Sequence, residues 1–514
     1  MYGIGFWLYK HAKLHPNRVA LITPEKTFTY GDLNREANRV AHALTALGLK
    51  EGDRIGVLCM NYPQFLCLLF GAGKLGVVNV SLNYRLTPPE IAYQMTDSNV
   101  RVLFVGSEQA SYIAPLKEQT KIAKVFVLEG DAPAGCGAYA ELIRNQSDAE
   151  PAEPISWDKG LLTVYTSGTT GKPKGAVLSH ANQFWNAMND IIPLRLTADD
   201  VMLTILPLVH VGGVGLFTLP ALLLGGKVVM PRKFDPEESL RLIEKEKVTV
   251  VMGVPAIWQM LIAAPLFKTA DLSSVRYFYN GGDRCPLEVV KVFRERGLTF
   301  GGGYGLTETS PTAFMLEPED FIRGTQTLGF IGKPAFFNEA RFVSPEGKDV
   351  PPGEVGEIWL RGGNVFGGYL NRPDANAEVF TEGWFHTGDL AMHDEEGCTF
   401  VVGRSKEMFK SGGLNVYPAE IEAVMGRHPA IREVCVIGVP DPKWNEVGKA
   451  IVALKPGTTA TPDELIAFCE GQLARYKLPK SIVFVDALPR NTLGKVNRGE
   501  LKLKFSDPVQ GAGQ

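Results

Sequence analysis

The residues best suited to chemistry form a loop rich in glycine, serine and threonine, Thr163–Gly175 (TVYTSGTTGKPKG), which also carries two lysines. An apolar run, Leu161–Thr166, predicts a buried strand that leads into this loop. Glycines let backbone N–H groups turn toward an anion, hydroxyls add hydrogen-bond donors, and lysines add positive charge. These residue types predict a polyphosphate site. A Walker P-loop is excluded, because Pro173 follows Gly171 and Lys172.

A loop of this composition is more often a solvated surface turn, so the order of its residues carries the prediction. Four further motifs follow it: Tyr304–Glu308 (YGLTE), His386–Asp389 (HTGD), Gly403–Glu422 (GRSKEMFKSGGLNVYPAEIE) and Pro489–Arg498 (PRNTLGKVNR). Together with Thr166–Gly175, they resemble the motifs of adenylate-forming enzymes, which include acyl- and aryl-CoA synthetases, beetle luciferases and peptide-synthetase adenylation domains. Leu473–Lys480 and Gly413–Glu422 are most similar to fatty-acyl-CoA synthetases.

The elements that must position these motifs alternate between apolar strands and amphipathic helices. Strands are predicted at Arg54–Met60, Arg101–Gly106, Val248–Gly253 and Val275–Asn280, and a helix at Tyr62–Leu75. This alternation predicts an α/β fold of parallel sheets covered by helices. After Arg404 the pattern changes to strands at Ile431–Pro440, Lys449–Lys455 and Ser481–Val485. A helix with a capping box at Thr461 and Glu464 is predicted to run to about Tyr476.

The tail therefore reads as a separate α+β unit. We predict a domain at residues 1–403 and a second at 404–514, with a hinge near Lys406. The resemblance implies the same architecture: a large N-terminal domain of parallel αβ sheets plus a barrel, and a small mobile C-terminal domain.

The resemblance implies an AMP-forming acid–CoA ligase that uses ATP, Mg²⁺ and CoA. A carboxylate attacks the α-phosphate of ATP and pyrophosphate leaves; a thiol then attacks the acyl-adenylate and AMP leaves. Two anions must meet, so positive charge and positioning are needed. By resemblance, Lys495 bridges the carboxylate and the α-phosphate, and Glu308 binds the metal with Thr166. A surface lysine is the ordinary alternative for Lys495.

The nucleotide site implied by the resemblance has Tyr304 against adenine, Thr307 at the α-phosphate, Asp389 at the ribose hydroxyls and Arg404 at the ribose or phosphate. Without the motifs, Tyr304 would be an ordinary core aromatic and Asp389 a turn residue. The other predicted ATP-binding residues are Thr166, Ser167, Gly168, Thr169, Thr170, Gly171, Lys174, Gly303 and Gly305.

The acyl pocket is predicted to be apolar and to suit a monocarboxylate. His210 flanks the carboxylate by resemblance, although a hydrogen-bonded core histidine remains the alternative. The other predicted pocket residues are Val254, Trp258, Gly281, Gly282, Gly302 and Pro311. The glycines leave room for a long tail or a flat ring. Asp283 departs from the small residue found in relatives.

For the second half-reaction, rotation at Lys406 would remove Lys495 and bring Gly412 and Gly413 to the site, where glycines admit a pantetheine arm. Tyr476 is the other predicted CoA-binding residue. A helix C-terminus that favours cations is the alternative for the basic residues beside it.

A medium- or long-chain fatty acid is the favoured substrate, and an aryl acid of the hydroxycinnamate or benzoate type is the alternative. A peptide-synthetase domain is disfavoured, because His210 and Val211 stand where an acidic residue would hold an amine. A luciferase, a ligase that uses a carrier protein, and a non-enzymatic membrane-associated protein remain open.

Composition restricts the expected partners and cellular location of the protein. The formal net charge of −3 gives no broad basic field, so nucleic acid is not expected as a partner. The seven cysteines include no C-x-x-C pair and no secretory signal is evident, which favours the reducing cytoplasm. Val201–Gly226 lacks charged residues, but Pro207, Pro220 and its glycines argue against a transmembrane span. Peripheral membrane contact stays open.

Overall fold

The chain divides into two compact units in a computed structural model that describes residues 2–166, 172–321, 329–490 and 495–507. Unit 1 comprises Met1–Thr327, Ile331–Glu339 and Leu360–Phe385, and unit 2 comprises Leu328–Phe330, Ala340–Trp359 and His386–Gln514. Strands β17 (Asn338–Val343), β18 (Gly356–Gly362) and β20 (Trp384–His393) each include residues of both units. The chain therefore passes between the units several times.

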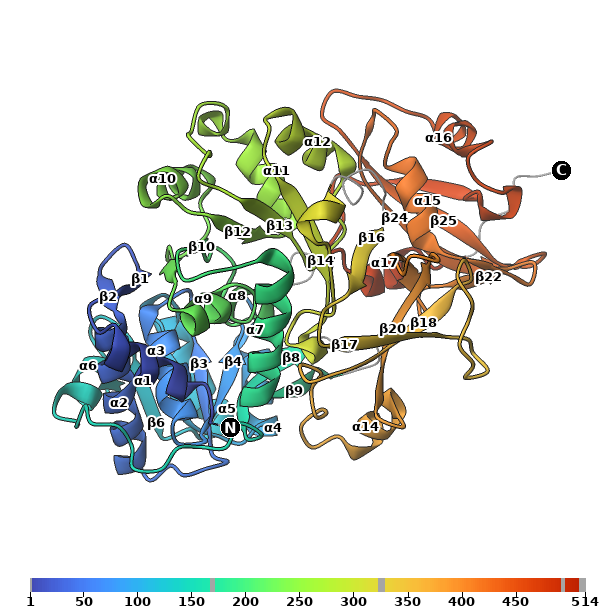
Figure 1. The fold of residues 1–514 in the computed structure, drawn as a ribbon. Helices are drawn as coiled ribbons and strands as arrows, with labels where there is room; N and C mark the ends of the chain where they lie inside the picture. Colours follow the sequence, from blue (N-terminus) through green and yellow to red (C-terminus); the bar gives the residue numbers. More distant parts are fainter. Residues whose placement is uncertain (1, 167–171, 322–328, 491–494, 508–514) are drawn as a thin grey trace. The chain divides into compact units, whose positions relative to one another are not determined.

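The first sheet of unit 1 has the order β7-β6-β5-β3-β4-β8-β9 (Figure 1). Neighbouring strands are parallel from β7 to β8, and β9 lies antiparallel to β8. The strands are β3 (Arg54–Leu58), β4 (Val78–Leu82), β5 (Val100–Val105), β6 (Lys124–Val127), β7 (Gly137–Ala138), β8 (Gly160–Thr166) and β9 (Lys174–Ser179). The accompanying helices are α1 (Gly5–Leu14), α2 (Tyr30–Ala46), α3 (Pro63–Gly73), α4 (Pro88–Asp97), α5 (Ile113–Thr120) and α6 (Tyr139–Arg144).

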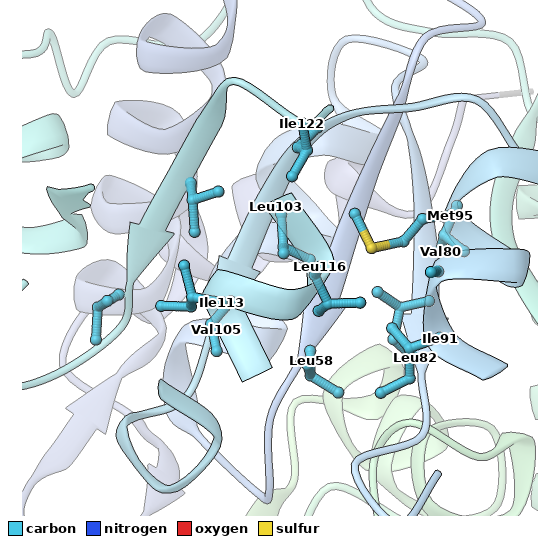
Figure 2. Packing of buried hydrophobic residues seen from close by; sticks show 13 residues of the cluster. Leu58, Val80, Leu82, Ile91, Met95, Leu103, Val105, Ile113, Leu116 and Ile122 are labelled. Carbon is cyan, nitrogen blue, oxygen red and sulfur yellow. The ribbon is translucent and has the colours of Figure 1, made fainter. Parts of the chain in front are cut away.

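One face of this sheet is buried under α4 and α5. Figure 2 shows Ile91 and Met95 of α4 and Ile113 and Leu116 of α5 packed near side chains such as Leu103 of β5. The strands read as continuous apolar runs because helices bury both faces of a parallel sheet. The predicted strands at Arg54–Met60 and Arg101–Gly106, and the helix at Tyr62–Leu75, are confirmed as β3, β5 and α3.

A second sheet in unit 1 carries the residues predicted for nucleotide and acid. Its order is β16-β15-β14-β13-β12-β10-β11-β1-β2, parallel from β14 to β1. The strands are β1 (Val19–Ile22), β2 (Thr27–Thr29), β10 (Val201–Leu203), β11 (Lys227–Val229), β12 (Val250–Gly253), β13 (Tyr277–Asn280), β14 (Phe300–Tyr304), β15 (Phe314–Met315) and β16 (Phe330–Pro334). The remaining elements of unit 1 are α7 (His180–Leu194), α8 (Val211–Val214), α9 (Thr218–Leu224), α10 (Pro236–Glu246), α11 (Pro255–Ala263), α12 (Leu287–Glu295), α14 (Pro373–Val379) and β19 (Phe380–Thr381).

Unit 2 contains a third sheet of order β23-β22-β25-β24, with β26 parallel to β25. The strands of this sheet are β22 (Phe409–Ser411), β23 (Leu414–Val416), β24 (Ile431–Asp441), β25 (Asn445–Leu454) and β26 (Ser481–Phe484). Unit 2 also contains β21 (Thr399–Arg404), which pairs with β20, and the helices α15 (Pro418–Met425), α16 (Pro462–Cys469) and α17 (Arg498–Phe505). Alternate side chains of β24 and β25 pack into two separate clusters, one with α15 and α16 and the other with α17. The third sheet is therefore covered on both faces.

Two predictions about these elements have definite outcomes. The capping box at Thr461 and Glu464 is present, but the helix that it begins ends at Cys469, not near Tyr476. Gly471 adopts a left-handed φ of 76°, and the chain makes a separate short turn at Arg475–Lys477. Val201–Gly226 forms β10, α8 and α9, and none of the described helices is long and apolar enough to cross a membrane.

Candidate active site

The strands that flank the phosphate loop form an antiparallel hairpin. Thr166, the last residue of β8, pairs with Lys174, the first residue of β9. The hydroxyl of Thr166 donates to the carbonyl oxygen of Lys174 over 3.5 Å. Pairing therefore brings the two predicted phosphate ligands together at the base of the loop. Ser167, Gly168, Thr169, Thr170 and Gly171 lie outside the described residues.

The carboxyl end of β14 leads into the turn that carries Glu308. A Cβ on Gly305 would overlap the carbonyl oxygen of Pro311, so the turn closes tightly only with glycine there. Glu308 follows in the short helical turn Thr307–Thr309 and is 7% exposed. Its backbone carbonyl accepts a hydrogen bond from the N–H of Phe366 at 2.8 Å. The end of a parallel strand is a usual place for a ligand in such sheets.

Tyr369 links Glu308 to the phosphate hairpin. Its hydroxyl donates to Glu308 Oε1 at 2.7 Å, and the ammonium of Lys174 lies 5.2 Å from the centre of its ring. The backbone next to it joins β9, because Leu370 N–H donates to the carbonyl oxygen of Gly175 at 2.8 Å. Within unit 1 the structure thus brings together Lys174, Glu308 and Tyr369.

Tyr304, the residue predicted for adenine, is half-buried at the end of β14. It pairs with Phe314 of β15, and the two rings meet edge to face at 5.8 Å. Beside it, a Cβ on Gly303 would lie 2.7 Å from the carbonyl oxygen of Phe314 and 2.9 Å from the hydroxyl of Tyr279. Gly303 therefore permits close packing of β14 against its neighbours.

The residues predicted for the acyl pocket lie in unit 1, on loops, on β14 and on α11. His210 precedes α8 and its carbonyl accepts from Val214 N–H at 3.1 Å, while Pro311 is buried after a cis peptide bond. A Cβ on Gly282 would lie 3.4 Å from Val254, and one on Gly302 would lie 3.1 Å from the carbonyl oxygen of Asn280. Val254 and Gly282 are thus neighbours.

Trp258 is fully buried. Its indole N–H donates to Asn280 Oδ1 at 3.0 Å, and its ring contacts Phe278, Phe293 and Phe300. A buried indole that has a hydrogen-bond partner is a stabilising core group. Its position therefore supports the strands that carry the predicted pocket residues.

In unit 2, Asp389 and Arg404 face each other across β20 and β21. Arg404 Nε lies 2.9 Å from Asp389 Oδ1, and Asp389 is 4% exposed. The motif before Asp389 is also fixed: Thr387 donates to the carbonyl oxygen of Ile358 at 2.8 Å. His386 stacks on Trp359 with ring centres 3.9 Å apart, and burial lowers the pKa of its imidazole. Arg404 therefore orients the carboxylate that was predicted for the ribose.

Lys495 is exposed in unit 2, next to a strongly bound arginine. Arg498 Nη2 lies 2.7 Å from Glu422 Oε2, Arg498 Nε lies 3.2 Å from Glu407 Oε2, and Arg498 Nη1 donates to the carbonyl oxygen of Val436 at 2.9 Å. Burial lowers the pKa of Arg498, but Glu422 and the other acidic neighbours outweigh it and raise the pKa overall. This network anchors the segment that follows Lys495 to α15, β24 and the residue after Lys406.

The predicted hinge and CoA residues also lie on the surface of unit 2. Lys406 is exposed between β21 and β22. Gly412 and Gly413 form the tight turn between β22 and β23, with φ values of 58° and 82°. Two consecutive positive φ values are typical of a two-residue hairpin and explain both glycines without a ligand. Tyr476 is 37% exposed.

Comparison with known proteins decides the family. Residues 8–370 match the family of AMP-binding enzymes, and residues 420–495 match the C-terminal domain of the same enzymes. The chain belongs to the AMP-binding enzyme family.

Relatives of this AMP-binding enzyme are ligases of organic acids. It is 41% identical to a feruloyl-CoA synthase of Amycolatopsis sp, over 98% of this chain and 99% of that protein. It is 41% identical to an indoleacetate–CoA ligase of Aromatoleum aromaticum, over 96% and 97% of the two chains. A long-chain fatty acid–CoA ligase of Mycobacterium tuberculosis is 35% identical, over 99% and 100%.

A solved structure extends the likeness to the whole fold. The crystal structure of ATP-bound MatB from Rhodopseudomonas palustris matches with a TM-score of 0.90 and 31% identity, over 98% of this chain and 99% of that chain. The AMP-binding enzyme described here is an acid–thiol ligase of the AMP-forming acyl-CoA synthetase type. Its partners are the small molecules ATP, CoA and a carboxylic acid.

Sequence reasoning missed Tyr369 in this enzyme. The signal was weak: an aromatic residue follows Gly367 and Gly368 and precedes Leu370 and Asn371. Such a pattern alone predicts only a turn. Tyr369 and Glu308 are 61 residues apart in the sequence, so the local pattern could not have revealed their contact.

Proposed function

We propose that this ligase activates an aromatic acid with a short side chain, of the hydroxycinnamate or arylacetate class. The observation that carries the proposal is the likeness to the feruloyl-CoA and indoleacetate–CoA ligases, at 41% identity each, against 35% for the fatty acid ligase. The glycines that follow β13 and those of β14 were predicted to leave room for a long tail or a flat ring. The space beside several of them is filled by side chains of this chain itself.

Three positions illustrate this filling. A Cβ on Gly301 would overlap the ring of Phe321, one on Gly281 would lie 2.6 Å from the methyl carbon of Met252, and one on Gly303 would meet Tyr279. Glycines packed in this way allow close backbone approach, and the space at these three Cβ positions is not open to an alkyl chain. A flat ring needs less depth than such a chain, which favours the aromatic class. The fatty acid ligase likeness over 99% of the chain keeps a medium- or long-chain fatty acid as the second candidate.

In the proposed reaction, Lys495 supplies positive charge where the carboxylate attacks the α-phosphorus. Thr307 donates to the α-phosphate, Asp389 binds the ribose, and Tyr304 packs on adenine. The ion pair with Arg404 orients the Asp389 carboxylate. Lys174 lies beside the loop predicted for the phosphates. Each of these groups is charged or polar where the nucleotide needs a partner.

Magnesium fits the oxygens that we assign to it. Glu308 offers a buried carboxylate whose Oε1 is oriented by Tyr369, and Thr166 offers a hydroxyl at the base of the phosphate hairpin. Mg²⁺ prefers oxygen ligands and binds through one or two carboxylates plus phosphate oxygens. When bound, it would neutralise charge on the departing pyrophosphate.

For thioester formation we propose a domain division at residues 403 and 404 with a hinge at Lys406, and CoA contacts at Gly412, Gly413 and Tyr476. Exposure of Lys406 between β21 and β22 suits a backbone pivot. Lys406→Pro is expected to spare adenylation and to suppress thioester formation. Equal thioester turnover in this variant and the parent enzyme would rule out the hinge.

A cytoplasmic location stays a prediction from composition.

The substrate test is a pyrophosphate-release screen with and without CoA. Ferulate, indole-3-acetate, octanoate, hexadecanoate and succinate are compared at equal concentrations, with Lys495→Ala as the inactive control. We expect kcat/KM for an aromatic acid to exceed that for either fatty acid by about tenfold or more, since a mismatched side chain costs roughly 1–3 kcal/mol. A higher kcat/KM for a fatty acid would overturn the aromatic assignment, and transfer only to a carrier protein would overturn CoA as acceptor.

A further inference from the structure

Helix α7 buries a row of polar side chains in the interior of unit 1. Asn186, Asn189 and Asp190 are completely buried, and Asn182 is 8% exposed. Burying such groups is costly unless each finds hydrogen-bond partners. Their spacing puts them on one face of the helix, and their hydrogen-bond partners lie on several segments of unit 1.

The principal neighbour is Thr312, four residues after Glu308. The hydroxyl of Thr312 donates to Asp190 Oδ1 at 2.7 Å, and its N–H donates to Asn186 Oδ1 at 2.8 Å. The amide of Asn186 donates in turn to Asp190 Oδ2 at 3.3 Å and to the carbonyl oxygen of Gly215 at 3.1 Å. Both the side chain and the backbone of Thr312 are thus held by α7.

Two further asparagines hold the same segment from other elements. Asn364 donates to the carbonyl oxygens of Thr309 and Thr312 at 2.7 and 2.5 Å. Asn338 donates to the carbonyl oxygens of Thr312 and Ala313 at 3.3 and 3.2 Å. The segment Thr309–Ala313 is therefore tied to three separate parts of unit 1.

This arrangement connects two parts of the proposed site. Helix α7 begins at His180, directly after β9, which starts at Lys174 in the phosphate hairpin. The segment at its other end includes Pro311 and directly follows Glu308. Helix α7 thus follows Ser179, at the end of the hairpin opposite its loop, and its other end holds the segment that follows Glu308, the proposed metal-binding carboxylate.

We propose that Asn186 and Asp190 are positioning residues, which act through Thr312 to fix Glu308 and Pro311 relative to the phosphate hairpin. The inference rests on the proposed roles of Glu308 and Pro311. A displacement of about 1 Å at a reacting group can lower the rate by about a hundredfold, so a network that removes such freedom acts on the chemical step. It does so without touching a substrate.

The electrostatics agree with a neutral network. Burial raises the pKa of Asp190 well above its usual range, although hydrogen bonds from Thr312 and Asn186 lower it in part. A buried carboxyl that stays neutral avoids the desolvation cost of a charge. Asp190→Asn therefore keeps shape and charge, whereas Asp190→Ala removes the partner of Thr312.

The chain offers a matched control for the hydroxyl of Thr312. In unit 1, Thr249 Oγ1 donates to Oδ1 of Asp200 at 2.7 Å, and Asp200 is 3% exposed. Both bonds join a threonine hydroxyl to a buried aspartate over the same distance, although Asp200 also forms an ion pair with Arg276. Thr249 precedes β12, and no predicted site residue takes part in its bond. Thr312→Val and Thr249→Val each remove one hydroxyl from a buried aspartate.

The experiment measures ATP–pyrophosphate exchange with an acid that the parent enzyme accepts, together with the melting temperature of each variant. Thr312→Val is expected to lower kcat by about tenfold or more at saturating ATP, magnesium and acid. Thr312→Ser, which keeps the hydroxyl, should stay within about threefold of the parent enzyme. Thr249→Val should stay within about twofold, although both valine variants melt earlier.

Each outcome decides the proposal. A kcat for Thr312→Val equal to that of Thr249→Val at a similar melting temperature would show a purely structural network. If Thr312→Val fails to fold, Asp190→Ala and Asp190→Asn replace it, and an equal kcat for these two would overturn the proposal. Glu308→Gln separates the two inferences. Full activity in that variant would remove the proposed role of Glu308, whereas the role of Thr312 is decided by the kcat of Thr312→Val compared with that of Thr249→Val.

Discussion

The two units hold their proposed catalytic segments by different physics. In unit 1, the segment after Glu308 donates hydrogen bonds to Asn186 and Asp190 and accepts them from Asn338 and Asn364, and all four side chains are buried. In unit 2, the segment after Lys495 is fixed largely by the guanidinium of Arg498, whose side chain is 23% exposed. Several hydrogen bonds together fix the segment in unit 1, whereas a single cation between two carboxylates fixes the segment in unit 2.

The difference teaches where each half of the site is vulnerable. Neutral buried networks are insensitive to salt and rigid once every member is satisfied. An ion pair of partly exposed side chains is weakened by salt, and the loss of its cation leaves the two carboxylates unpaired. We therefore expect unit 1 to keep a fixed geometry and unit 2 to depend on single residues.

The largest effect is expected at Lys495 itself. Lys495→Ala removes the charge proposed to stabilise the attack on the α-phosphorus, so acyl-adenylate formation should fall by about 10²–10³-fold. Thioester formation from supplied acyl-adenylate should stay within about tenfold of the parent enzyme. Measuring both half-reactions separately tests the role, and an equal loss in both would remove it.

A smaller effect is expected at the anchor of that segment. Arg498→Met leaves Glu407 and Glu422 without their cation, and the free energy of unfolding should fall by about 2–4 kcal/mol, the usual cost of breaking a buried pair reduced for partial exposure. Adenylation should fall by about tenfold or more. Arg432→Met is the control and should change neither, because Arg432 is exposed on β24, the strand that Arg498 contacts through Val436. If Arg498→Met and Arg432→Met have the same free energy of unfolding and the same rate of ATP–pyrophosphate exchange, Arg498 does not anchor the segment after Lys495.

In unit 1, Tyr369→Phe tests the hydroxyl that orients Glu308. A typical hydrogen bond contributes about 0.5–1.5 kcal/mol net, so the magnesium concentration for half-maximal activity should rise by about twofold to tenfold. Tyr139→Phe is the matched control, because the hydroxyl of Tyr139 donates to Glu36 Oε1 at 3.0 Å. A similar magnesium requirement in both variants would contradict the orienting role.

The smallest effect concerns stability and pH. The unfolded chain releases the proton of Asp190 near the ordinary carboxyl pKa, whereas the folded chain keeps it to higher pH. The folded state binds more protons in that window, so the free energy of unfolding falls as pH rises, by at most about 1.4 kcal/mol per pH unit. Tyr279, whose pKa is raised by burial and by Asp190, stays neutral throughout.

Asp190→Asn should remove this contribution. Chemical denaturation between pH 4 and pH 8 is expected to give a flatter profile for the variant than for the parent enzyme. A parallel profile in both proteins would place the ionised form of Asp190 in the folded state.

Much of the fold and of the nucleotide site was predictable because the signal was local. Strands β3 and β5, helix α3 and the capping box at Thr461 follow from periodicity and end residues. Asp389 and Arg404 were both predicted for the nucleotide, although the ion pair between them was not. Confirmation of the family supports the motifs, while the roles of the individual residues stay predictions.

The parts that escaped prediction depend on distant partners. Asn182, Asn186, Asn189 and Asp190 at helical spacing indicate a solvated face, yet that face is buried, because its partners lie more than 100 residues away at Thr312 and Asn338. The early end of α16 depends on a left-handed glycine that a propensity pattern cannot distinguish from any other. Burial of polar groups is decided by tertiary contacts.

The central claim is that the carboxylate of the acid attacks the α-phosphorus of ATP. It is tested most directly by supplying an accepted acid labelled with ¹⁸O in both carboxylate oxygens, together with ATP, magnesium and CoA. The mass of the AMP that forms is then measured by mass spectrometry. The account predicts AMP that carries one ¹⁸O atom. Unlabelled AMP, or label in inorganic phosphate, would contradict it.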